Sequence, residues 1–155
     1  MKATLKRILL HPWLTVRCQI ALGLVFVIAS LGKLADPPAF AKAIWNYQLF
    51  PAWSVHPVAI VLPWLELFCG LALCLGLWAR AATGWLLALL LAFTVALSIN
   101  LARRHPVDCG CFHLSGPAKS EAERLVDLRW AILRDLGLIL LAAQILMATR
   151  QPRPE

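Results

Sequence analysis

Residues 81–102 form an apolar run without a single charged residue, and this run constrains the fold more than any other feature. A helix needs about 20 predominantly apolar residues to cross a hydrocarbon core about 30 Å thick. Three more apolar runs, at residues 15–35, 55–78 and 130–149, have similar lengths. Since lipid offers no partners to backbone polar groups, we predict that all four runs are helices. The predicted fold class is all-α: a polytopic membrane four-helix bundle that forms one integral membrane domain, residues 1–155.

The composition favours lipid over water as the surroundings of these helices. Of the 155 residues, 61% are hydrophobic and 15% are charged, whereas a soluble domain carries roughly 25% charged residues. The net charge of +7 comes from basic residues at the edges of the apolar runs. Because cations in such places anchor helices at the membrane surface, we expect membrane lipid as a partner and no nucleic acid.

A short interfacial helix is predicted in the first outer loop. Asp36-Pro37-Pro38 ends the first run, because proline cannot continue a helical hydrogen-bond ladder. Within residues 39–49, Phe40, Ile44 and Tyr47 recur at spacings of four and three, with polar residues between them. This pattern favours an amphipathic helix that lies along the membrane surface.

Four crossings would place both termini on one side of the membrane and the two longer loops on the other. Four basic residues come at or before the start of the first span: Lys2, Lys6, Arg7 and Arg17. Because the first helix usually dominates orientation, we predict cytoplasmic termini. The loop of residues 103–128 would then face the periplasm or the exterior.

This loop carries the sharpest chemical signal of the chain, Asp108-Cys109-Gly110-Cys111. Two cysteines separated by one glycine can close a small disulfide ring, and Gly110 permits the backbone angles that such a ring demands. A tight, exposed disulfide is strained and readily exchanged. On an oxidising face of the membrane, the predicted chemistry is therefore thiol–disulfide exchange at Cys109 and Cys111.

Charged residues near the motif would tune its thiols. Arg103 and Arg104 would stabilise a thiolate, whereas Asp108 would act in the opposite direction or serve as a proton acceptor. Further along the loop, Ser120 and Glu123 have the spacing of a capping box, which predicts the start of a short helix.

Two other interpretations of the loop stay open. A disulfide between the cysteines could simply stiffen it. A metal site is the second alternative, because His105, Cys109, Cys111 and His113 lie close together in sequence. Structural zinc sites usually separate paired cysteines by two or more residues, so we predict no metal.

Charged residues inside the spans form a second candidate site. Glu66 lies near the middle of its span, and a carboxylate within the membrane is a functional-site hypothesis that requires a partner. We expect Arg134 to be that partner, with Lys33 as the second choice and Asn100 as a further member of the network. A packing role for Glu66 is favoured over direct catalysis.

Pairing between Arg134 and Asp135, and a chemical role for the cysteines of the spans, are not expected. Arg134 and Asp135 are neighbours in sequence and should point to different sides, so we do not expect them to pair with each other. Lone cysteines in apolar helices are usually inert small hydrophobes. No role is therefore predicted for Cys18, Cys69 and Cys74.

Taken together, these motifs resemble the MauE family within the wider DoxX-like membrane group. The resemblance covers about residues 15–150 and is carried by LGKLADP at 31–37, LPWLEL at 62–67, DCGCF at 108–112 and LRD at 133–135. One departure is His113, where such proteins often have glycine. The resemblance implies a four-helix protein of the bacterial inner membrane that is linked to methylamine utilisation.

The resemblance also implies a role in processing, export or maturation of the disulfide-rich small subunit of methylamine dehydrogenase. Cys109 and Cys111 match the redox pair of the family, while Glu66 and Arg134 match its intramembrane polar positions. The implied partners are a periplasmic thioredoxin-like protein and a disulfide-containing periplasmic client. A further electron carrier would be needed, for which a quinone is the candidate cofactor.

Two other classes of function stay open. The first is a non-enzymatic membrane subunit or chaperone whose Cys-Gly-Cys loop is structural, which replacement of Cys109 and Cys111 by serine would reveal. The second is a small-molecule transporter that uses Glu66 and Arg134. Proton-coupled uptake that depends on Glu66 and survives loss of both loop cysteines would favour it.

Overall fold

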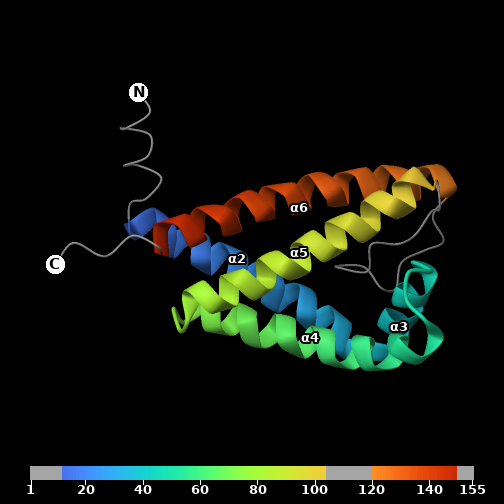
Figure 1. Ribbon diagram of the computed structural model, residues 1–155, viewed down its shortest axis with the longest axis horizontal. Helices are drawn as coiled ribbons and strands as arrows, with labels where there is room; N and C mark the ends of the chain where they lie inside the picture. Colours follow the sequence, from blue (N-terminus) through green and yellow to red (C-terminus); the bar gives the residue numbers. More distant parts are fainter. Residues whose placement is uncertain (1–11, 104–119, 150–155) are drawn as a thin grey trace.

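The computed structural model describes residues 12–103 and 120–149, and every regular element in these stretches is an α-helix (Figure 1). In chain order the helices are α2 (Pro12–Ala35), α3 (Pro37–Asn46), α4 (Ala52–Cys74), α5 (Ala79–Ala102) and α6 (Glu121–Thr149). All except α3 are long and apolar enough to cross a membrane. The 24 residues of α5 extend about 36 Å at 1.5 Å per residue, which exceeds a hydrocarbon core of about 30 Å. The prediction of an all-α polytopic membrane protein is confirmed.

The long helices are arranged as two pairs (Figure 1). α2 packs mainly on α4 and α5 packs mainly on α6, while contacts of α4 with α5 and of α2 with α6 join the pairs. The first residues of α2 and the last residues of α6 lie at the same end of the bundle, as an even number of crossings requires. α3 lies near the other end, where it packs on α4 and α2.

The outer surface of the bundle is apolar. Large hydrophobic side chains that point outward occur on every long helix, including Ile28, Phe68, Leu91 and Leu140. Trp13, Trp53 and Trp78 are highly exposed at or next to helix ends, where indole rings favour the membrane–water boundary. Lipid is the solvent that such a surface requires, so the protein is a multi-pass membrane protein.

The pairing of α2 with α4 depends on two glycines. A Cβ atom added to Gly23 would lie 2.7 Å from the backbone oxygen of Gly70, and one added to Gly70 would lie 3.0 Å from the oxygen of Gly23. Two backbones approach this closely only where neither residue has a side chain, which is how membrane helices maximise their packing. This contact fixes the position of α4 relative to α2.

The helix boundaries correct two of the predicted spans. The second run was predicted to be helical from 55 to 78, but α4 ends at Cys74. Gly76 has a φ of +70°, its N–H donates to the carbonyl of Leu73, and the N–H of Leu77 donates to the carbonyl of Ala72. This is a Schellman motif, in which a glycine with positive φ ends the helix.

The fourth run begins earlier than predicted, because α6 starts at Glu121 and not near Trp130. Ser120 and Glu123 form the capping box that the sequence predicts: the Ser120 N–H donates to Glu123 Oε2 at 2.8 Å, and the Glu123 N–H donates to Ser120 Oγ at 3.3 Å. The short helix that the sequence predicts at Ser120 is the polar first part of α6. It continues without a break into the apolar span.

The predicted short helix after the first span is present as α3, at Pro37–Asn46 instead of residues 39–49. Asp36 caps it by accepting a hydrogen bond from the Ala39 N–H at 3.0 Å, and Pro37 occupies the first helical position. Phe40 and Ile44 are buried against α4, so the apolar face of α3 faces the bundle.

Candidate functional site

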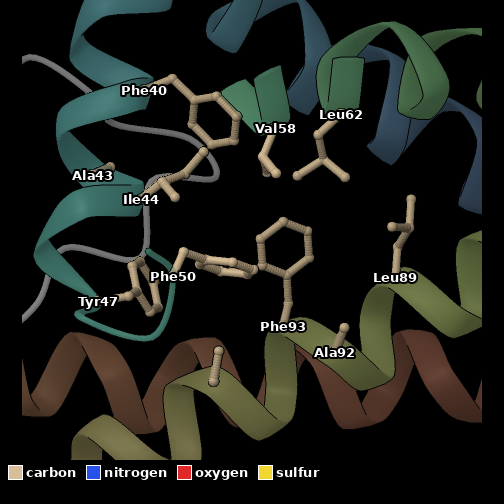
Figure 2. Close-up of a pocket in the computed structure, with 11 residues that line it drawn as sticks. Phe40, Ala43, Ile44, Tyr47, Phe50, Val58, Leu62, Leu89, Ala92 and Phe93 are labelled. Carbon is tan, nitrogen blue, oxygen red and sulfur yellow. The ribbon is translucent and has the colours of Figure 1, made fainter. Parts of the chain in front are cut away.

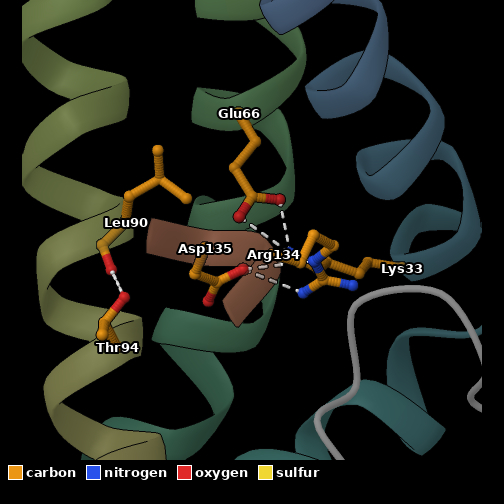
Figure 3. Close-up of polar contacts among 6 residues, drawn as sticks. All are labelled: Lys33, Glu66, Leu90, Thr94, Arg134 and Asp135. Atoms are coloured by element: carbon orange, nitrogen blue, oxygen red, sulfur yellow. Dashed lines mark hydrogen bonds and ion pairs between the residues drawn. The ribbon is translucent and has the colours of Figure 1, made fainter. Parts of the chain in front are cut away.

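The structure joins the first two long helices through a buried ion pair between Lys33 and Glu66. Lys33 lies in the last turn of α2 and Glu66 in the middle of α4. The Lys33 ammonium donates to both carboxylate oxygens, with Nζ–Oε1 and Nζ–Oε2 distances of 2.7 and 2.6 Å (Figure 3). Each residue is 1% exposed. Because both charges are removed from water, each depends on the other for compensation.

Lys33, the second choice from the sequence, is thus the partner of Glu66 in place of Arg134. The reason is that α2 and α4 pack against each other. The Gly23–Gly70 contact brings their backbones together, and both charged residues lie further along the same interface. The order of the spans in the sequence does not reveal which of them are neighbours in space. Arg134 is on α6, whose main contacts are with α5.

Arg134 pairs with Asp135, although the sequence predicted that these neighbours would point apart. The guanidinium donates through Nε and one terminal nitrogen to Asp135 Oδ1, at 3.2 and 3.0 Å. That prediction is wrong because the long arginine side chain bends across the helix surface to reach the short carboxylate. Asp135 is buried, whereas the Arg134 side chain is 34% exposed.

The two ion pairs lie close together. Figure 3 shows the carboxylates of Glu66 and Asp135 directed toward the region where the side chains of Lys33 and Arg134 end. The Lys33 ammonium also attracts the Asp135 carboxylate electrostatically. Two cations and two carboxylates from α2, α4 and α6 therefore form one charge-balanced cluster inside the bundle. The sequence analysis did not place Asp135 in the network, although a carboxylate within a span is itself a signal, as it was for Glu66.

Two aromatic rings flank the Lys33 ammonium. Nζ lies 5.2 Å from the centroid of the Phe40 ring, on α3, and 5.1 Å from the centroid of the Phe93 ring, on α5. Both are cation–π contacts, which attract a desolvated ammonium more strongly than one in water. Lys33 consequently connects α2 to three other helices. Neither ring was predicted to belong to the site, since phenylalanine in an apolar run carries no distinguishing signal.

Asn100 is buried near the end of α5, and its side chain donates to the carbonyl of Ala96 in the same helix, at 3.0 Å. Its predicted membership of the charged network stays a prediction. The hydrogen bond satisfies the amide locally, as polar side chains in apolar helices often do.

An apolar cavity of about 250 Å³ lies between α3, α4 and α5 (Figure 2). Four aromatic side chains, Phe40, Tyr47, Phe50 and Phe93, line it together with aliphatic residues of α4 and α5. Phe40 and Phe93 also flank Lys33, so the cavity and the charged cluster share two walls.

The predicted redox residues Cys109, Cys111 and Asp108 lie outside the described residues, as do His105 and His113. They belong to the segment that connects α5 to α6, and thiol exchange there stays a prediction. Within residues 12–103 and 120–149 no cluster of three or more metal-ligating side chains occurs.

The remaining cysteines, Cys18, Cys69 and Cys74, are free thiols and partly buried. Cys18 and Cys69 pack against the apolar core around Leu22 and Leu73. These surroundings are those of small hydrophobic residues. The absence of a chemical role for them stays a prediction.

The four spanning helices and the charge-balanced cluster between them define a class: a polytopic membrane protein with a polar centre. A family model for methylamine utilisation protein MauE matches residues 11–148. The chain belongs to the MauE family. No solved structure gives a significant match.

Relatives of this family resemble the chain over most of its length. Methylamine utilization protein MauE of Methylorubrum extorquens is 35% identical over 137 residues, which are 87% of this chain and 69% of that protein. The protein of the same name from Paracoccus denitrificans is 35% identical over 131 residues, 84% of this chain and 69% of its own. That of Methylophilus methylotrophus is 35% identical over 101 residues, and the match spans 53% of its length. The family resemblance seen in the motifs is confirmed, while the wider DoxX-like grouping stays a prediction.

Proposed function

We propose that the protein is a membrane-bound maturation factor of a methylamine-utilising system and that it acts by thiol–disulfide exchange at Cys109 and Cys111. The observation that carries the proposal is the family match over residues 11–148, which includes the Cys-Gly-Cys motif. Relatives named for methylamine utilisation support the pathway. The paired cysteines in the segment between two spans support the chemistry.

The exchange proceeds through a mixed disulfide. In the oxidising direction, a thiolate of the client attacks the Cys109–Cys111 disulfide, breaks its S–S bond and forms a new bond to one of the two sulfurs. A second client thiolate then attacks the mixed disulfide, which leaves the client with a disulfide and the pair as two thiols. Two electrons and two protons have moved from client to pair. The client is proposed to be the disulfide-rich small subunit of methylamine dehydrogenase, reached through a thioredoxin-like partner.

The proposed location is the bacterial inner membrane, with both termini in the cytoplasm and the Cys109–Cys111 segment in the periplasm. An oxidising compartment on that side would keep the pair available as a disulfide. The first residues of α2 and the last residues of α6 lie at one end of the bundle, and the last residues of α5 and the first residues of α6 lie at the other.

The charged cluster would serve this function as a support. Lys33 binds Glu66 of α4, contacts Phe40 of α3 and Phe93 of α5, and attracts Asp135 of α6. All these elements are thereby held together in the half of the bundle where α5 ends. A rigid frame at the base of the redox segment reduces the entropy lost when a partner docks.

A trapping experiment tests the proposal. Replacing Cys111 by serine leaves Cys109 as a single thiol. Its thiolate can attack the disulfide of an oxidised partner, the reverse of the step above, and the mixed disulfide should accumulate on non-reducing gels because no second thiol of the pair can displace it. The reciprocal Cys109→Ser variant should trap through Cys111. Cys69→Ser is the matched control, because it removes a thiol from α4 and leaves the pair intact. If neither single variant traps any protein while methylamine dehydrogenase matures normally without both cysteines, the exchange function is excluded.

A further inference from the structure

A groove of about 570 Å³ lies between α3 and the first part of α4, and it shares no lining residue with the apolar cavity. Lys42 and Trp45 line it from α3, whereas His56 and Ile60 line it from α4. The members of each pair are three or four residues apart, so each pair occupies one face of its helix. The volume lies within the roughly 300–1,000 Å³ typical of small-molecule sites.

The floor of the groove is apolar and well packed. Val55 and Ala59 line the groove, are each 3% exposed, and pack in one cluster with Phe40 and Ile44 of α3. The groove is therefore a surface feature of two helices in firm contact. Its floor offers a ligand only hydrocarbon to bind.

The mouth of the groove carries positive charge and a hydrogen-bond donor. Lys42 and His56 are exposed, and in residues 12–103 and 120–149 neither side chain has a hydrogen bond or an ion pair. No carboxylate lines the groove. The nearby Asp36 is engaged as the cap of α3, where it accepts from the Ala39 N–H. A cleft with charge of one sign attracts a ligand of the opposite sign, which here is an anion.

The groove lies where the membrane surface meets the hydrocarbon core. The 23 residues of α4 extend about 35 Å, which exceeds a core of about 30 Å, so the ends of α4 reach the headgroups. His56 is in the second turn of α4, and Ile60 lies one turn deeper. Trp45 and Trp53 are exposed at this end, as expected for indole rings at the boundary. The polar mouth is thus level with lipid headgroups and the apolar part with acyl chains.

We propose that this groove binds one anionic phospholipid, with the phosphate on Lys42 and His56 and an acyl chain along Ala59 and Ile60. Such a lipid is amphipathic in the same direction as the groove. A free phosphate would leave the apolar part uncovered. A zwitterionic lipid fits less well, because its choline group brings a second cation toward Lys42. The proposal goes beyond thiol exchange and does not depend on it.

The charge preference is tested by native mass spectrometry of the full chain in a neutral detergent. Phosphatidylglycerol and phosphatidylcholine with identical acyl chains are titrated, and we expect the first phosphatidylglycerol to bind about fivefold more tightly, the effect of one lysine near a membrane surface. Lys42→Gln should remove most of this preference. Arg129→Gln is the matched control, because it removes an exposed cation of α6 outside the groove, and it should change the affinity less than twofold.

The contribution of the imidazole is measured in the same titration. His56→Leu keeps an apolar side chain at the position and removes the N–H donor. It should lower the affinity for phosphatidylglycerol about threefold, the equivalent of one neutral hydrogen bond.

The position of the lipid is tested in nanodiscs with a phosphatidylglycerol that carries a photoreactive diazirine in one acyl chain. We expect saturable labelling of Ile60 and its neighbours in the groove, reduced by Lys42→Gln and unchanged by Arg129→Gln. Equal affinities for the two lipids, labelling outside the groove, or equal losses in the two variants would overturn the proposal. Competition by inorganic phosphate as strong as by unlabelled phosphatidylglycerol would also overturn it, since the groove would then be a site for a soluble anion. Labelling of the unaltered chain decides the question even if a variant fails to fold.

Discussion

The ion pairs Lys33–Glu66 and Arg134–Asp135 differ in what they connect. Lys33–Glu66 joins two helices that are far apart in sequence, and both of its side chains are fully enclosed. Arg134–Asp135 joins neighbours on one helix, and its arginine is one-third exposed. The first pair therefore depends on the tertiary fold and also constrains it. The second can form in an isolated α6.

This difference bears on how each charge is compensated. If Lys33 is lost, no other cation hydrogen-bonds to Glu66 in the part of the chain that the structure describes. The partly exposed Arg134, in contrast, can turn toward the membrane surface if Asp135 is lost. Buried charges without partners are the costly ones. The two pairs should thus respond very differently to single substitutions.

The largest effect is expected for Lys33→Met. Removing one partner of a buried pair typically costs about 3–5 kcal/mol, because the other charge stays buried and uncompensated. The variant should lower the free energy of unfolding by this amount in mixed-micelle denaturation by sodium dodecyl sulfate. Lys42→Met, on α3 away from the ion pair, is the matched control and should change stability little. A loss below about 1 kcal/mol would mean that Glu66 is neutral in the folded protein, so that its ion pair contributes little.

A smaller loss is expected for Gly23→Ala, which acts on the helix contact that sets up the pair. The new Cβ would meet the Gly70 oxygen at 2.7 Å and Cys74 Sγ at 2.5 Å. Overpacking of this kind typically costs about 1–3 kcal/mol. The same denaturation assay measures it, with Gly84→Ala as the control, since a Cβ there meets nothing within 4 Å. Equal behaviour of the two variants would show that α2 and α4 are not in close contact at Gly23.

The four spans could be predicted from sequence because apolar runs long enough to cross a bilayer, with few charges in them, have few physical explanations. The capping box at Ser120 and the proline stop at Asp36-Pro37-Pro38 were likewise visible, since caps and breakers act locally. The end of α4 could not be predicted from the sequence. Gly76 lies within a continuous apolar run, and hydropathy does not distinguish a helix from a turn there.

The candidate site was only partly predictable for a different reason. Glu66 and Lys33 stood out as charges in apolar surroundings, but the choice between Lys33 and Arg134 depends on which helices are adjacent. That adjacency comes from the backbone contact of Gly23 with Gly70, a tertiary feature without a sequence spacing of its own. Phe40 and Phe93 could not be selected at all, because their role comes from the position of the ammonium between them.

For the second ion pair, Asp135→Asn should lower the free energy of unfolding by about 1 kcal/mol, because a hydrogen bond to a charged acceptor becomes a weaker one to a neutral acceptor. The amide keeps the shape and can still accept from Arg134, which is free to reach the surface. Thermal unfolding in detergent, compared with Arg134→Gln, measures the effect. A loss as large as that of Lys33→Met would reveal Asp135 as a principal partner of Lys33, and the cluster would then be a single unit with one shared cation.

The smallest change in stability is expected when both members of the interhelical pair are replaced together, Lys33→Met with Glu66→Met. Substituting a buried ion pair by apolar residues of similar volume is often neutral or stabilising, because neither charge then has to be desolvated, so we expect a change within about 1 kcal/mol. Together with both single variants, Lys33→Met and Glu66→Met, the double variant completes a double-mutant cycle that isolates the interaction from the cost of an orphaned charge. If the double variant is as unstable as the single one, the methionines fail to fill the space and the pair has a packing role that apolar side chains cannot replace. If it is stable but the proposed maturation of methylamine dehydrogenase is impaired, the ion pair serves activity and not the fold.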